Sequence, residues 1–124
     1  MKKFGITKRI QSTMSYNLGD VILVPFPFTN QTQSKKRPAV IVNSTSYNQR
    51  YSDVILMAIT SQVKHPFSFG EIEIVNWQNA GLLKPSVIKP VFTTIETSLI
   101  LRRLGSLDAN DKENLKAILQ IVLG

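Results

Sequence analysis

The chain has 124 residues, of which 43% are hydrophobic, and its 15 Lys and Arg against 8 Asp and Glu give a formal net charge of +7. This composition is that of one globular domain and excludes a disordered chain. No cysteine is present, which excludes disulfides, thiolate metal sites and cysteine nucleophiles. The lone His65 excludes a multi-histidine metal site within one chain. The charge favours a polyanion such as nucleic acid, or an acidic protein, as partner.

The first residues differ from the rest in composition. Residues 1–15 are basic and polar, and we expect a poorly ordered leader there, with the globular domain over residues 16–124. Met14 is an alternative start, and a basic arm on nucleic acid is the alternative role of the leader. Lys8 and Arg9 interrupt any signal peptide, and every apolar stretch is far shorter than the roughly 20 residues of a membrane span. We therefore expect a cytoplasmic protein that does not enter a membrane.

Six short segments have the β-branched content or the alternation of strands. Their expected ranges are residues 20–24, 38–42, 53–59, 69–74, 86–89 and 101–104. Pro25 and Pro27 are expected to end the first strand, and a polar loop over 29–36 precedes the second. Residues 43–52 have turn composition with room for one helical turn, and residues 76–83 indicate a short helix or turn that stops near Gly81.

The C-terminal residues have the pattern of an amphipathic helix. Asp108 is placed to cap it, and Asp111 and Glu113 lie in the first turns, where the helix dipole favours anions. The apolar stripe follows the helical spacing at Leu115, Ile118, Leu119 and Val122. The expected fold is therefore mainly β with a C-terminal helix, arranged as a small antiparallel barrel or roll.

Three of the expected strands are apolar on both alternating faces, namely residues 21–24, 39–42 and 54–59. A strand of a small antiparallel barrel is normally apolar on one face only. Either the leader and the terminal helix cover the second face, or a second copy of the chain does. We expect the second copy, and hence a homodimer.

The positions of the carboxylates and of the histidine in the sequence do not indicate a catalytic site. Glu71 and Glu73 alternate along one expected strand, which is more typical of a solvated face than of a glycosidase pair. His65 lies in a polar loop, where an ordinary exposed histidine is expected. No glycine-rich nucleotide-binding loop is present.

An arginine and two hydroxyls at strand ends are more informative. Arg37 opens the second expected strand, and Thr60 and Ser61 close the third. In a small barrel these ends can meet. A guanidinium beside hydroxyls suits a phosphate, because arginine stays charged and binds two phosphoryl oxygens at once. The ordinary alternative is a loop cation beside a turn.

Five motifs in order resemble the MazF/PemK toxin family. They are GDVI at 19–22, KRPAVIV at 36–42, AITS at 58–61, GLLKPSV at 81–87 and RLGSL at 103–107, and the resemblance covers roughly residues 16–124. It implies an SH3-like barrel, a homodimer and the toxin of a type II toxin–antitoxin system. Such a toxin is a metal-independent endoribonuclease without cofactor that cuts single-stranded RNA by attack of the 2′-hydroxyl, and a small acidic antitoxin blocks it.

The resemblance also implies roles for individual residues. Arg37 would be the catalytic arginine and Thr60 the catalytic hydroxyl, with Ser61 adjoining them. The candidate RNA contacts are Thr29, Asn30, Lys35, Lys36, Gln62, Lys64 and Lys84. Residues 86–91 contain no acid, although some members carry a carboxylate there, so the proton-transfer group is unassigned. The alternative is a non-catalytic SH3-like barrel, either a CcdB-like gyrase-binding toxin or an inactive toxin homologue.

Overall fold

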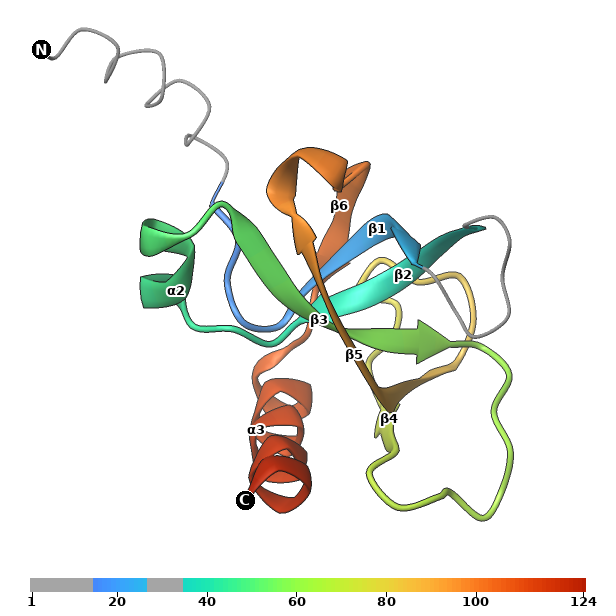
Figure 1. The fold of residues 1–124 in the computed structure, drawn as a ribbon. Helices are drawn as coiled ribbons and strands as arrows, with labels where there is room; N and C mark the ends of the chain where they lie inside the picture. Colours follow the sequence, from blue (N-terminus) through green and yellow to red (C-terminus); the bar gives the residue numbers. More distant parts are fainter. Residues whose placement is uncertain (1–14, 27–34) are drawn as a thin grey trace, which may run out of the picture.

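The computed structural model describes residues 15–26 and 35–124. One antiparallel sheet in the order β4-β5-β3-β2-β1-β6 curls into a half-barrel (Figure 1). Its strands are β1 (Asp20–Phe26), β2 (Lys35–Ile41), β3 (Asp53–Thr60), β4 (Ile72–Ile74), β5 (Ser86–Glu96) and β6 (Arg102–Ser106). The helical elements are α2 (Thr45–Arg50), the short 3-10 helix η1 (Thr97–Leu99) and α3 (Ala109–Leu123). The expected fold class, mainly β with a C-terminal helix, is confirmed.

Three strands run through prolines, of which Pro25 and Pro90 lie beyond the ends of the strands that the sequence predicts. The pairing of β1 with β6 ends at Leu23. At Pro25, the edge of β1 that faces β6 therefore needs no backbone N–H for a sheet hydrogen bond. The pairing of β2 with β3 begins only at Ala39, one residue after Pro38. Pro90 lies where the register between β5 and β3 shifts. Each proline thus lies where a neighbouring ladder has ended or is interrupted.

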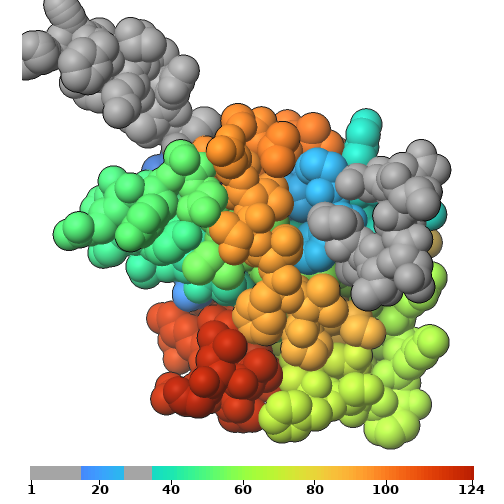
Figure 2. All heavy atoms as spheres, viewed as in Figure 1, coloured from blue at the N-terminus to red at the C-terminus, as the bar shows by residue number. Residues whose placement is uncertain are grey.

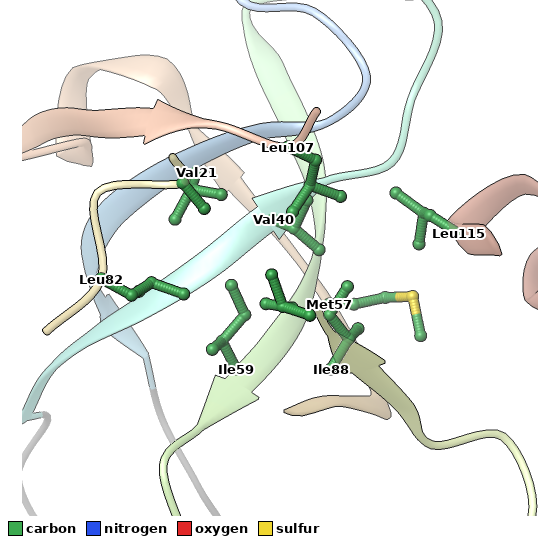
Figure 3. Close-up of a cluster of buried hydrophobic side chains, with 10 residues drawn as sticks. Val21, Val40, Met57, Ile59, Leu82, Ile88, Leu107 and Leu115 are labelled. Carbon is green, nitrogen blue, oxygen red and sulfur yellow. The ribbon is translucent and has the colours of Figure 1, made fainter. Parts of the chain in front are cut away.

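One face of the sheet packs against α3 and the turn that precedes β5. Val40, Met57 and Ile88 point from the sheet toward Leu115 of α3, and Leu82 closes the cluster from the side of the turn (Figure 3). All of these residues are buried, and Leu115 is fully inaccessible to solvent. The predicted apolar stripe of α3 is therefore the stripe that reaches the core.

The other face carries a second buried cluster, whose members on the sheet include Ile22, Ile41 and Leu56. Ile95 of β5 and Ile100, just after η1, pack against this cluster. The space-filling view shows β5 and its connection to β6, in orange, across the front of the molecule (Figure 2). Ile95 and Ile100 thus cover part of the second apolar face within a single chain, and residues 1–14 of the expected leader lie outside the described residues. The apolar strands by themselves therefore do not require a second copy, and the homodimer stays a prediction.

Two aspartates fix the start of α3. Asp108 caps the helix and accepts a hydrogen bond from the Asp111 N–H at 2.8 Å. The Asp111 carboxylate is buried and accepts the backbone N–H groups of Val75 at 3.0 Å and Asn76 at 2.9 Å. Asp111 therefore does more than complement the helix dipole, because it ties α3 to the turn that leads toward β5. Within the described residues, no helix is long and apolar enough to cross a membrane.

Candidate functional site

The site is built around the turn formed by residues 75–81, which packs closely against β6. The turn ends at Gly81, as the sequence predicts, and Gly81 has a positive φ. Ala80 and Gly81 pack backbone to backbone against Leu104 and Gly105, which leaves no room for a side chain at either glycine. This contact joins two motifs that are about twenty residues apart in the sequence. It fixes the position of Leu82 and of the exposed residues that follow.

Beside this turn lies a hollow of about 440 Å³, called here the larger hollow. The ends of β2 and β3, the turn and the start of β6 form its walls. Its basic side chains are Lys36, Arg37, Lys84 and Arg102, and its hydroxyl side chains are Thr60, Ser61 and Ser86. Its apolar side chains include Leu23, Pro38, Ile59, Leu82, Leu83 and Leu104. None of the residues that line it is acidic, so it attracts anions.

Arg37 and Thr60 both line the larger hollow. The pairing of β2 with β3 begins with Ala39 opposite Ala58, and Arg37 and Thr60 each lie two residues beyond that pair, at the same end of the two strands. The Arg37 side chain is half-buried and its Nε atom is inaccessible to solvent, so packing restrains the guanidinium. Ser61 lines the same hollow. The structure therefore brings together the three residues predicted for catalysis.

The residues predicted to bind RNA divide into groups. Lys36, Gln62 and Lys84 line the larger hollow. Lys64 lines a second hollow next to it. Lys35 is exposed at the start of β2 and lines neither hollow. Thr29 and Asn30 lie outside the described residues.

The second hollow, called here the smaller hollow, has a volume of about 300 Å³. Thr60 and Gln62 line both hollows, so the two adjoin at the end of β3. The charged residues of the smaller hollow are Lys64, Glu71 and Lys89. It therefore differs from the larger hollow in containing a carboxylate.

Glu71 was expected on a solvated strand face, and this expectation was wrong. β4 begins only at Ile72, so Glu71 precedes the strand. Its carboxylate accepts the Ser68 N–H at 2.9 Å and pairs with the Lys89 ammonium at 3.1 Å. The hydrogen bond from Ser68 and the pairing with Lys89 lower the pKa of Glu71 below its ordinary value. Glu71 is therefore a fixed carboxylate rather than a mobile surface group.

Sequence reasoning missed three charged residues of the two hollows, namely Glu71, Lys89 and Arg102. The spacing of Ser68 and Glu71 is that of a side chain that closes on a backbone N–H three residues away, and this was the one local signal for Glu71. Lys89 and Arg102 are brought to the hollows by strand pairing, for which the sequence carries no local mark. Across the described ranges, no three His, Cys, Asp or Glu side chains gather as a metal site would require.

Sequence and structure comparisons identify relatives of the chain. A family model described as "PemK-like, MazF-like toxin of type II toxin-antitoxin system" matches residues 17–123. No curated protein sequence matches the chain.

Several solved structures share the fold. An endoribonuclease in complex with its cognate antitoxin from Mycobacterial species is 15% identical with a TM-score of 0.72, over 89% of this chain and 96% of that one. The Mycobacterium tuberculosis toxin MazF-mt6 is 22% identical with a TM-score of 0.67, over 84% and 95%. MazF from Deinococcus radiodurans is 17% identical with a TM-score of 0.69, over 90% and 98%. At these identities the likeness concerns the fold.

Proposed function

The chain belongs to the PemK-like and MazF-like toxins of type II toxin–antitoxin systems, and on this premise we propose that it is an endoribonuclease that cuts single-stranded RNA. The observation that carries the proposal is the larger hollow, where Arg37 and Thr60 lie together among further cations and beside an apolar wall. Cations hold phosphates, and apolar walls receive unpaired bases. The proposed site of action is the cytoplasm.

RNA supplies its own nucleophile for this reaction. The 2′-oxygen attacks the neighbouring phosphorus and loses its proton, while the bond from phosphorus to the 5′-oxygen breaks and that oxygen takes up a proton. The products are a 2′,3′-cyclic phosphate and a 5′-hydroxyl. The protein therefore needs mainly to hold the strand in line and to stabilise charge on the phosphoryl oxygens.

Arg37 and Thr60 are suited to that task. The Arg37 guanidinium can donate to two phosphoryl oxygens at once. The Thr60 Oγ1 accepts the Gln62 N–H at 3.1 Å, which leaves its own hydrogen to be donated to a phosphoryl oxygen. Ser61 supplies a second hydroxyl at the same edge.

Glu71 is a poor candidate for the general base. Both of its oxygens are engaged, one by Ser68 and one by Lys89, and its pKa is lowered. A general base works best with a pKa near the operating pH. The proposal therefore rests on phosphate binding by Arg37 and Thr60 and assigns Glu71 no proton transfer.

The proposal includes an acidic antitoxin and a homodimer as assembly partners. One solved relative is an endoribonuclease in complex with its cognate antitoxin, and another solved structure is that of MazE-MazF from Deinococcus radiodurans. The net charge of +7 and the four cations of the larger hollow favour an acidic ligand. Co-purification from the native host tests for a small acidic protein, and sedimentation at micromolar concentration tests for the dimer.

Cleavage of one defined RNA in EDTA tests the proposed activity. The wild-type protein should cut it, and 2′-deoxy substitution at the cleaved nucleotide should abolish cutting while leaving binding largely intact. In single-turnover reactions at matched saturation, Arg37→Ala should be slower by about 10² to 10³, because a preorganised donor to the transition state is lost. Binding without cutting would favour the non-catalytic alternative. Equal rates would show that Arg37 is not part of the site.

A further inference from the structure

The smaller hollow opens directly beside the proposed cleavage site. Thr60 and Gln62 form its boundary with the larger hollow, and Val87 lies among its lining residues. Its volume of about 300 Å³ lies at the lower end of the range of small-molecule sites. A strand whose phosphate lies at Thr60 therefore presents a neighbouring nucleotide to this hollow.

Glu71 lines this hollow, and contacts on both sides hold its carboxylate in a fixed position. The turn before β4 is closed from both sides, because Glu71 N–H donates to the Ser68 carbonyl at 3.0 Å while Ser68 N–H donates to the Glu71 carboxylate at 2.9 Å. Lys89 holds the other carboxylate oxygen at 3.1 Å. The Glu71 side chain is only 12% exposed. Each oxygen still has a lone pair available for a ligand.

A fixed carboxylate in a site that binds RNA favours groups that donate hydrogen bonds. Lys64 and Lys89 also line the smaller hollow, so Glu71 offsets part of their attraction for a phosphate, while its oxygens can accept the N–H groups of a base. Unpaired RNA bases are read through such edges. Guanine has two adjacent donors, N1–H and the 2-amino group, next to the acceptor O6. A carboxylate beside an ammonium matches that edge, with Glu71 accepting the two donors and Lys89 donating to O6.

We propose that the smaller hollow is a base-reading subsite that selects guanine beside the cleaved phosphate, through Glu71 and Lys89. The other bases satisfy this pair less well, because none of them presents two adjacent donors on its Watson–Crick edge. This inference rests on the proposed ribonuclease function and adds a sequence preference to it. In this proposal Glu71 and Lys89 select the base, while Arg37 and Thr60 bind the phosphate that is cleaved.

The test uses an RNA pool with a randomised stretch, cut by the full-length protein and sequenced at the new ends. In the wild type, guanine should be enriched at one position next to the cut by about tenfold or more, which corresponds to one good bidentate contact. In Glu71→Gln the enrichment at that position should fall to about threefold or less, because the amide has one acceptor and cannot take both donors. Preferences at other positions should persist in this variant, which shows that it is folded and active.

Glu73→Gln is the matched control. Glu73 is exposed on β4 and lines neither hollow, so this variant should keep the guanine preference. Lys89→Met is a second test, and it should weaken the preference because methionine has no N–H to donate to O6. Cutting without guanine preference, or a preference that survives both Glu71→Gln and Lys89→Met, would overturn the subsite and leave the ribonuclease function intact. If the wild type cuts no RNA, the proposed function and the subsite both fail.

Discussion

Gly81 lies so close to Leu104 that a Cβ built on Gly81 would stand 2.0 Å from the Leu104 carbonyl oxygen. Gly81 also has a φ of +79°, a left-handed conformation that other residues rarely adopt. We expect Gly81→Ala to lower the free energy of unfolding by about 2 kcal/mol or more, since strain and a clash with backbone act together. Urea denaturation measures the loss.

Gly19→Ala is the control for Gly81→Ala. Gly19 has a φ of +96°, but the three atoms nearest to its added Cβ all belong to the Lys112 side chain, the closest at 2.9 Å, and that side chain can move. The loss should therefore be smaller than at Gly81. Equal losses in the two variants would show that the left-handed φ alone, and not the contact with Leu104, determines the cost.

Removal of the Thr60 hydroxyl tests its proposed role. Thr60→Val keeps the shape of the side chain and should slow single-turnover cleavage by about tenfold, less than Arg37→Ala, because one neutral donor is lost rather than a charged one. Thr60→Ser keeps the hydroxyl and should stay close to the wild type. If Thr60→Val cuts at the wild-type rate, the Thr60 hydroxyl takes no part in cleavage, and the catalytic hydroxyl has to be sought elsewhere than at Thr60.

The cations of the larger hollow should act on binding rather than on the chemical step. Lys36→Ala and Lys84→Ala should each weaken RNA binding and flatten its salt dependence by about 0.7 in log–log slope per lost phosphate contact. Lys116→Ala is the control, because Lys116 lies on α3 with Glu113 as its partner at 3.7 Å, outside both hollows. Titration of a labelled RNA at several salt concentrations gives the slopes. Equal slopes in all three variants would argue against phosphate contacts in this hollow.

Asp108 should make stability sensitive to acid. The Asp111 N–H and then the Asn76 side chain donate to its carboxylate and lower its pKa. Because folding lowers this pKa, the stabilisation is complete above the ordinary aspartate value of about 3.9 and is lost as the pH falls through the lowered folded value. Asp108→Asn still caps the helix but does not titrate.

Unfolding of both proteins in urea between about pH 5 and pH 2 checks this linkage. The wild type should lose more stability over this range than Asp108→Asn. Other carboxylates, Glu71 among them, titrate in both proteins and therefore drop out of the difference. Parallel curves would show that the cap contributes no pH dependence.

The sequence predicted the type of each element better than its length. The spacing of apolar residues indicates which side chains are buried. It therefore predicts the alternation of the strands and the apolar stripe of α3. Strand ends depend instead on where a neighbouring ladder stops, and Pro25, Pro38 and Pro90 are tolerated for that reason. The cover of the second apolar face was also unpredictable, because Ile95 and Ile100 reach it only through the path of β5.

The site was predictable to the extent that it lies at strand ends. Arg37 and Thr60 follow or precede polar loops in the sequence, and antiparallel pairing of two adjacent strands brings such ends together. Lys89 lies on β5 and Glu71 directly precedes β4. The pairing of these two strands, with Ile72 opposite Ile88, has no local signal in the sequence. A carboxylate in the site therefore became visible only in three dimensions.

The two hollows share Thr60 and Gln62 as a common wall, and this has a consequence for inhibitor design. Neither volume alone is large, so a fragment that occupies one hollow has few contacts with which to gain affinity. Because the hollows adjoin, an anionic fragment beside Arg37 and a donor-rich ring beside Glu71 can be joined by a very short linker. The second fragment then binds at a high effective concentration, and the joined compound gains affinity without any new contact.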